Sequence, residues 1–247
     1  MAAVLQTEPE VMPAIELDQV SLGWRDKVAV RDLSGRFLRG SLTAVVGPNA
    51  AGKSTLLRGI MGWVSPLAGH IRVAGKAAER LAFMPQQGDF DRSFPIITRD
   101  FVAMGAWRRV GPWRAFGKGE RDRLDASLQA VGLGDFGRRP LATLSGGQLQ
   151  RALFARLMLH DADVVMLDEP FSAVDRATTE DLMALLMQWH AQGKTIVVVL
   201  HDLELVRRHF PQALLLAGQG VAWGDTGEVL TPENLHLARH LCAGDYL

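Results

Sequence analysis

The sequence predicts an α/β fold in which helices cover a buried, largely parallel sheet. Several short runs are rich in Val, Ile and Leu, as expected of strands that are buried on both faces. Stretches with helical patterning lie between some of these runs, which is the arrangement of α/β layers. With 48% hydrophobic residues among 247, the chain can also bury a core large enough for one or two domains.

The expected elements follow these runs in chain order. Strands are predicted at 14–20, 42–46, 81–84, 164–167, 195–200 and 213–216, and helices at 53–61, 147–159 and 177–191. The middle of the chain carries little strand signal, but 98–104 and 119–131 have helical patterning between glycine-rich breaks. We therefore predict a single domain over 1–247, with a core formed by 1–88 and 149–247 and a helical insertion at 89–148.

Composition excludes several classes of protein. The 27 Lys and Arg residues equal the 27 Asp and Glu residues, which argues against a surface built for nucleic acid. No apolar stretch reaches the ~20 residues of a membrane-spanning helix, and acidic residues precede the first basic residue, Arg25, unlike in a signal peptide. Cys242 is the only cysteine, which suits a reducing compartment and excludes an intrachain disulfide. We expect the protein inside the cell and outside the bilayer.

A phosphate-binding loop is the strongest motif. Gly47-Pro48-Asn49-Ala50-Ala51-Gly52-Lys53-Ser54 matches G-x-x-x-x-G-K-[ST] and lies between a predicted strand and a predicted helix. Backbone N–H groups of such a loop surround phosphate oxygens, Lys53 reaches the β and γ phosphates, and the Ser54 hydroxyl can bind Mg²⁺. Many such loops have glycine where this chain has Ala50. If that position requires a positive φ, alanine costs about 1 kcal/mol or more.

Two acidic residues end the next conspicuous strand. Asp168 and Glu169 follow Val164 to Leu167, and the carboxyl edge of a parallel sheet is where open α/β folds bind ligands. Asp168 can hold Mg²⁺, and Glu169 can then polarise a water molecule aimed at the γ phosphate.

A third motif, Leu144-Ser145-Gly146-Gly147-Gln148, precedes the helix predicted at 147–159. Ser145 and Gln148 have the spacing of a capping box, so this helix N-terminus is a second place suited to an anion.

With these motifs, the sequence resembles the ATP-binding subunits of ABC transporters along nearly its whole length. Gly47 to Thr55 resembles the Walker A loop, Leu144 to Gln148 the signature motif and Val164 to Glu169 the Walker B strand. Ser172 to Asp175 resembles the D-loop, His201 the switch histidine, and Gln86, with Gln87 beside it, the Q-loop glutamine. Trp24 occupies the place of an aromatic residue that stacks on adenine, usually Tyr; such stacking is worth ~1–3 kcal/mol.

The resemblance implies a RecA-like P-loop NTPase core with an antiparallel β subdomain and an inserted α-helical subdomain that carries the signature. It also implies ATP and Mg²⁺ as cofactors, with Ser54, Gln86 and Asp168 toward the metal. Glu169 would be the catalytic base, His201 would touch the γ phosphate and Gln86 would sense nucleotide. In a head-to-tail homodimer, Ser145, Gly146, Gly147, Gln148 and Asp175 would complete the partner's site.

The resemblance further implies integral-membrane permease subunits encoded separately and, indirectly, an extracytoplasmic substrate-binding protein. The ATPase would then lie at the cytoplasmic face of the membrane. The segment from Gln86 to Val102, with Phe94-Pro95 before Thr98-Arg99-Asp100, resembles ATPases of zinc and manganese importers. We expect a transition-metal importer, with zinc favoured over manganese. Iron-siderophore or cobalamin uptake, and a soluble ATPase of cofactor assembly, are the alternatives.

Two further features have no place in this scheme. His236 and His240 share a helical face at i, i+4; we interpret them as solvated residues rather than a metal pair and expect no tight zinc binding. The segment from Arg99 to Arg123 has seven basic residues interleaved with aromatic ones. It is either a docking surface for a membrane partner or lipid, or a solvated edge of the insertion; nucleic acid is a third possibility.

Overall fold

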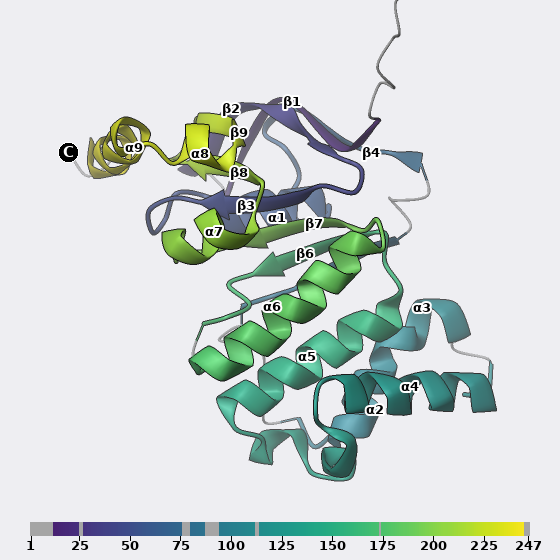
Figure 1. The fold of residues 1–247 in the computed structure, drawn as a ribbon. Helices are drawn as coiled ribbons and strands as arrows, with labels where there is room; N and C mark the ends of the chain where they lie inside the picture. Colours follow the sequence, from purple (N-terminus) through teal and green to yellow (C-terminus); the bar gives the residue numbers. More distant parts are fainter. Residues whose placement is uncertain are drawn as a thin grey trace, which may run out of the picture.

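A computed structural model describes residues 12–24, 27–75, 80–86, 94–111, 114–172 and 174–244. Two sheets organise these residues (Figure 1). The smaller sheet is antiparallel and has the order β2-β1-β4, formed by β1 (Pro13–Trp24), β2 (Lys27–Leu38) and β4 (Ala68–Val73). This sheet is the antiparallel β subdomain that the resemblance implied.

The larger sheet has the order β5-β6-β7-β3-β8-β9. Its strands are β5 (Leu81–Met84), β6 (Val164–Asp168), β7 (Thr195–Val199), β3 (Leu42–Val46), β8 (Gln212–Leu216) and β9 (Gly220–Asp225). The first five are parallel, and β9 pairs antiparallel with β8 at the edge.

Both faces of the larger sheet are covered, which explains its continuous apolar strands. Along β3, Val45 packs into a core shared with α1 (Lys53–Ile60) and the smaller sheet. Its neighbours Ala44 and Val46 point to the opposite face, where they join the core formed with the helices. Successive side chains of a strand point to opposite faces, so a strand buried on both sides needs an apolar residue at every position.

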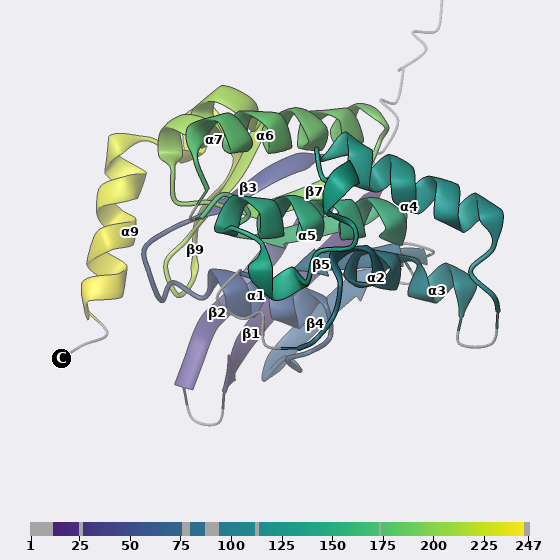
Figure 2. The ribbon, with the colours of Figure 1, turned by 90° about the horizontal axis from the view of Figure 1, so that it is seen from below.

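The helical face is built mainly from α5 (Gly146–His160) and α6 (Arg176–Ala191), which lie across the larger sheet (Figures 1 and 2). Three helices of the middle segment gather on α5: α2 (Thr98–Ala103), α3 (Trp107–Val110) and α4 (Lys118–Ala130). Short 3₁₀ turns occupy Met104–Ala106, Gly134–Phe136 and Leu141–Thr143. The chain ends with α7 (Leu203–His209), α8 (Thr226–Val229) and α9 (Pro232–Gly244).

The domain division remains a prediction, and its boundary at residues 148 and 149 falls inside α5. None of the described helices is long and apolar enough to cross a membrane.

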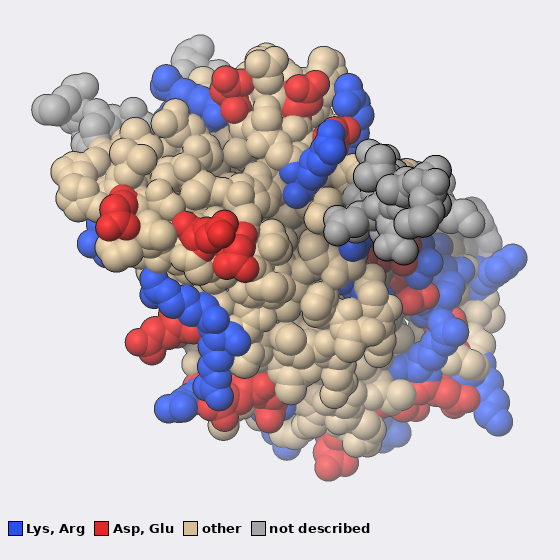
Figure 3. All heavy atoms as spheres, turned by 45° about the horizontal axis from the view of Figure 1, so that its top comes forward, with Lys and Arg blue, Asp and Glu red and all other residues tan. Residues whose placement is uncertain are grey.

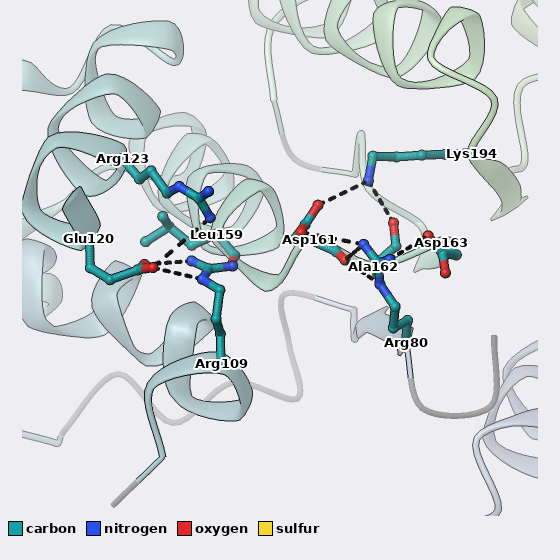
Figure 4. Close-up of polar contacts among 9 residues, drawn as sticks. All are labelled: Arg80, Arg109, Glu120, Arg123, Leu159, Asp161, Ala162, Asp163 and Lys194. Atoms are coloured by element: carbon teal, nitrogen blue, oxygen red, sulfur yellow. Dashed lines mark hydrogen bonds and ion pairs between the residues drawn. The ribbon is translucent and has the colours of Figure 1, made fainter. Parts of the chain in front are cut away.

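Basic side chains bind the carboxyl end of α5 and the loop that follows it (Figure 4). Arg109 of α3 donates to the carbonyl of Leu159 at 3.0 Å and makes two hydrogen bonds to Glu120 of α4, at 2.8 and 2.6 Å. Arg80 and Lys194 donate to the carbonyls of Asp161 and Ala162. The last carbonyls of a helix lack partners within the helix and carry partial negative charge, so these cations stabilise it.

The same contacts bear on the basic segment from Arg99 to Arg123. Arg99 pairs with Asp125, Arg121 donates to the carbonyl of Phe116, and Arg123 lies 4.0 Å from Glu120. Much of the basic excess is thus engaged within the helical insertion. Trp107 is 62% exposed, and Trp113 lies outside the described residues.

Candidate active site

The phosphate loop joins β3 to α1, and its two outer glycines are required by geometry. Gly47 has φ 151°, and a Cβ there would lie 1.9 Å from the carbonyl oxygen of Leu216. Gly52, the N-cap of α1, has φ 91°, and its Cβ would lie 2.4 Å from the carbonyl oxygen of Ala29. No side chain fits at either position, so both glycines are needed for the loop to pack between its neighbours.

Ala50 lies in the left-handed region, with φ 64°. This position of the loop therefore does require a positive φ, which is the case in which alanine was expected to cost free energy. An alanine held there costs about 1 kcal/mol relative to glycine.

Lys53 is folded back onto the loop. Its ammonium donates to the carbonyl oxygens of Gly47 at 2.9 Å and Pro48 at 2.7 Å. Burial lowers the pKa of Lys53, while the nearby carboxylates of Glu169 and Asp168 act in the opposite direction. The lysine is thus placed between the loop and the acidic pair.

The strand order brings the remaining candidates to this loop. Strands β5, β6, β7 and β3 are neighbours and parallel, so the segments after their carboxyl ends meet at one edge of the sheet. A cavity of about 750 Å³ lies there. Its lining comprises Ala29, Asn49, Ala50, Ala51, Gly52, Lys53, Ser54, Thr55, Gln86, Glu169 and His201.

The carboxylate of Glu169 is the centre of this arrangement. One of its oxygens, Oε2, accepts a hydrogen bond from Nε2 of Gln86 at 2.9 Å. The other, Oε1, lies 2.5 Å from Nε2 of His201. Residues from the ends of β5, β6 and β7 therefore meet on one carboxylate, while Asp168 beside it is 1% exposed.

The backbone of Glu169 has an unusual conformation that the sequence did not reveal, with φ 49°. Its N–H donates to the carbonyl of Val199, and its carbonyl accepts from both the N–H and the hydroxyl of Ser172. Buried Gln150 on α5 donates to the carbonyl of Pro170 at 2.5 Å. Strained backbone of this kind persists only where neighbours fix it, and it gathers at functional sites.

The signature residues form the predicted capping box. The N–H of Gln148 donates to Oγ of Ser145 at 3.2 Å, and the N–H of Ser145 donates to the Gln148 side chain at 3.0 Å. Asp175 caps α6 by accepting from the N–H and hydroxyl of Thr178, and these hydrogen bonds lower the pKa of Asp175.

These residues, together with Gly146, Gly147 and Trp24, are not among those that line the cavity. Among the described residues, the cavity is thus lined by residues 49–55 of the phosphate loop with Gln86, Glu169 and His201, but not by Gly47, Pro48, Asp168 or the signature. Gln87, the other glutamine considered for the Q-loop, lies outside the described residues.

Acidic and basic side chains are interspersed on the face shown in Figure 3, and wide areas of uncharged residues separate them. The chain as a whole has a formal net charge of zero.

Comparison with known proteins decides the family. Residues 30–172 match the family model described as ABC transporter. The chain belongs to the ABC transporter ATP-binding family.

Close relatives extend this match over most of the chain. The manganese transport system ATP-binding protein MntB of Bacillus subtilis is 39% identical over 225 residues, which are 90% of each chain. The zinc transport system ATP-binding protein TroB of Treponema pallidum is 38% identical over 229 residues, covering 91% of this chain and 86% of TroB. A solved structure described as the inward-facing conformation of an ABC transporter assigned to the metal-chelate type has 28% identity and a TM-score of 0.82. It covers 93% of this chain and 90% of that one.

Membership confirms the resemblance drawn from the motifs, and with it the activity. The chain is an ATP-binding ABC ATPase.

Proposed function

We propose that the cavity binds ATP with Mg²⁺, that Glu169 acts as the catalytic base, and that hydrolysis drives the import of a divalent transition metal. The observation that supports the site most strongly is the Glu169 carboxylate, which contacts Gln86 and His201 beside the phosphate loop. Phosphoryl transfer needs a group that orients and deprotonates the attacking water, with cationic and N–H groups around the phosphates.

We assign phosphate binding to the loop. Its backbone N–H groups and the partially positive N-terminus of α1 favour a negatively charged ligand. Lys53 would exchange its hydrogen bonds to the carbonyls of Gly47 and Pro48 for bonds to the β and γ phosphates. Thr55, which also lines the cavity, supplies a hydroxyl. We place the adenine on Trp24, which is 55% exposed at the end of β1.

The chemistry of the donor set fits Mg²⁺, which prefers oxygen ligands. Ser54 offers a hydroxyl, buried Asp168 a carboxylate, and Gln86 the amide oxygen that takes no part in its bond to Glu169. A bound Mg²⁺ would neutralise charge that develops on the phosphates. The protein's own contribution is to hold these three oxygens at the edge of the sheet.

Glu169 can receive a proton from water at an oxygen that now contacts His201 or Gln86. His201, which follows β7, would move from the carboxylate toward the γ phosphate. Gln86, which follows β5, would exchange its contact with Glu169 for the metal side of the site. The movements of His201 and Gln86 would thereby transmit the binding of nucleotide to the segments that follow β7 and β5.

We propose a head-to-tail homodimer in which the signature of one copy covers the phosphate loop of the other. The signature lies outside the cavity of its own chain, so a second copy would have to supply it. Ser145, Gly146, Gly147 and Gln148 present a helix N-terminus, which favours anions. Asp175 would lie at the same interface.

The cargo we propose is zinc or manganese, because relatives at 39% and 38% identity are named for manganese and zinc transport. The finer preference for zinc remains a prediction. The ATPase would act at the cytoplasmic face of the membrane, on permease subunits supplied with metal by an extracytoplasmic binding protein. Exposed Trp107 is a candidate contact for the permease.

Uptake of radioactive metal tests this function. Cells whose own copy of the gene is deleted would be complemented with the wild-type chain or with Glu169→Gln. We expect the wild-type chain alone to restore accumulation of ⁶⁵Zn or ⁵⁴Mn, and the metal restored identifies the cargo. Restoration of neither metal, with the protein present at normal levels, would contradict the proposal.

A further inference from the structure

Helix α9 presents two imidazoles to each other at the molecular surface. Nε2 of His236 and Nε2 of His240 are 3.1 Å apart, and the ring centroids are 4.3 Å apart at an angle of 65°. Both side chains are exposed, as their sequence suggested. The ring nitrogens nevertheless face one another, which a pair of independently solvated side chains would not require.

This separation matches what a shared metal ion needs. A zinc–imidazole bond is about 2.0–2.1 Å long, so two nitrogens on one tetrahedral ion are about 3.3 Å apart. The observed 3.1 Å is close to that value. The two nitrogens therefore already have nearly the separation that one shared ion requires.

Without a metal, the contact is a hydrogen bond between the two rings. In neutral imidazoles, one Nε2–H can donate to the other Nε2. For both rings to bind one metal through Nε2, the donor ring takes the tautomer that carries its proton on Nδ1, so that both Nε2 lone pairs are free and both rings stay neutral.

We propose that His236 and His240 form a binding site for a divalent late transition metal ion, of which zinc is the representative. Imidazole suits zinc, copper and nickel, whereas Mg²⁺ and Mn²⁺ prefer oxygen ligands. Among the described residues, no group of three or more His, Cys, Asp or Glu side chains could hold a metal. The pair thus supplies two ligands, water supplies the others, and binding is reversible.

The histidine pair lies close in sequence to residues of α9 that approach the phosphate loop. Leu241 and Cys242, which follow it directly, line a cavity of about 180 Å³ together with Asn49 and Ala50 of the phosphate loop. A metal bridging one turn of α9 stabilises that turn next to the loop. If the chain drives zinc import, which rests on the proposed function, the bound ion is the delivered cargo.

Calorimetric titration of Zn²⁺ into the full chain, stripped with EDTA and without nucleotide, tests the site. We expect His240→Ala to weaken zinc binding at least tenfold. The double variant Leu237→His/His240→Ala, which keeps the number of histidines but places them on different faces of α9, should bind as weakly as His240→Ala. His70→Ala, which removes an exposed histidine on β4, and Cys242→Ser, which removes the thiol, should bind like the wild type.

Thermal unfolding with and without Zn²⁺ provides a second readout, because a ligand of the folded state raises the melting temperature. The increase should be lost in His240→Ala, whose melting temperature without metal should equal that of the wild type. Equal zinc affinity of wild type and His240→Ala, or of wild type and the double variant, would overturn the site. Glu169→Gln should bind zinc normally while losing ATP turnover, so failure of this site and failure of the proposed function are distinguishable.

Discussion

Nε2 of His201 lies 2.5 Å from Oε1 of Glu169, and the other oxygen of that carboxylate accepts a hydrogen bond from Gln86. The histidine follows β7 and the glutamine follows β5, the two strands that flank β6. One carboxylate therefore links three parallel strands at the edge that carries the phosphate loop. A bound γ phosphate would compete for His201 and its Mg²⁺ would compete for Gln86, so nucleotide binding and release of the base are expected to occur together.

Glu169→Gln should retain ATP binding and reduce turnover by orders of magnitude. The amide keeps the size of the side chain but cannot accept a proton from water. Nucleotide affinity and phosphate release from the purified chain give the two quantities separately. Glu180→Gln on α6, the same substitution at an exposed position, should leave both unchanged. Wild-type turnover in Glu169→Gln would remove this residue from the mechanism.

Ala50→Gly should raise the free energy of unfolding by up to about 1 kcal/mol, because glycine adopts φ 64° without the steric cost that alanine bears. The greater freedom of glycine in the unfolded chain offsets part of this gain. The matched control is Ala126→Gly, on the exposed face of α4, where glycine should cost about 1 kcal/mol. Urea unfolding of both variants measures these opposite signs. Equal destabilisation by the two substitutions would mean that the loop conformation carries no cost.

Glu120→Gln should destabilise the chain by about 1 kcal/mol near pH 7. Hydrogen bonds from Arg109 lower the pKa of Glu120. A lowered carboxyl pKa stabilises the fold above the unfolded pKa of about 4.3, and this contribution is lost as the pH falls through the folded pKa. The difference between the wild type and Glu120→Gln in urea unfolding should therefore disappear in acid. Glu204→Gln on α7 serves as a control, and a difference that persists below the folded pKa would contradict the ion-pair account.

The sequence predicted the buried strands best. The ranges 42–46 and 81–84 coincide with β3 and β5, because a strand covered on both faces leaves a continuous apolar run. Strands β2, β4 and β9 were missed as individual elements, since their exposed and half-buried residues give no such run. The motifs placed the site residues along the chain. The positive φ of Glu169 and its support by Ser172 depend on contacts between segments, which no local pattern encodes.

Trp24→Ala should weaken ATP binding by about 5- to 150-fold, the range that corresponds to the ~1–3 kcal/mol of base–aromatic stacking. Trp24 is 55% exposed at the end of β1 and lies outside the lining of the phosphate cavity. Its loss should therefore affect adenine and leave the phosphate contacts in place. Trp24→Tyr should retain most of the affinity, because a phenol ring also stacks.

The control is Trp63→Ala, which removes a tryptophan of similar exposure, 59%, that packs edge-on against Phe83. Affinities for ATP and for inorganic triphosphate, measured by competition, separate the two contributions: Trp24→Ala should change the first and not the second. An equal loss for both ligands would place Trp24 in the support of the loop rather than on the base.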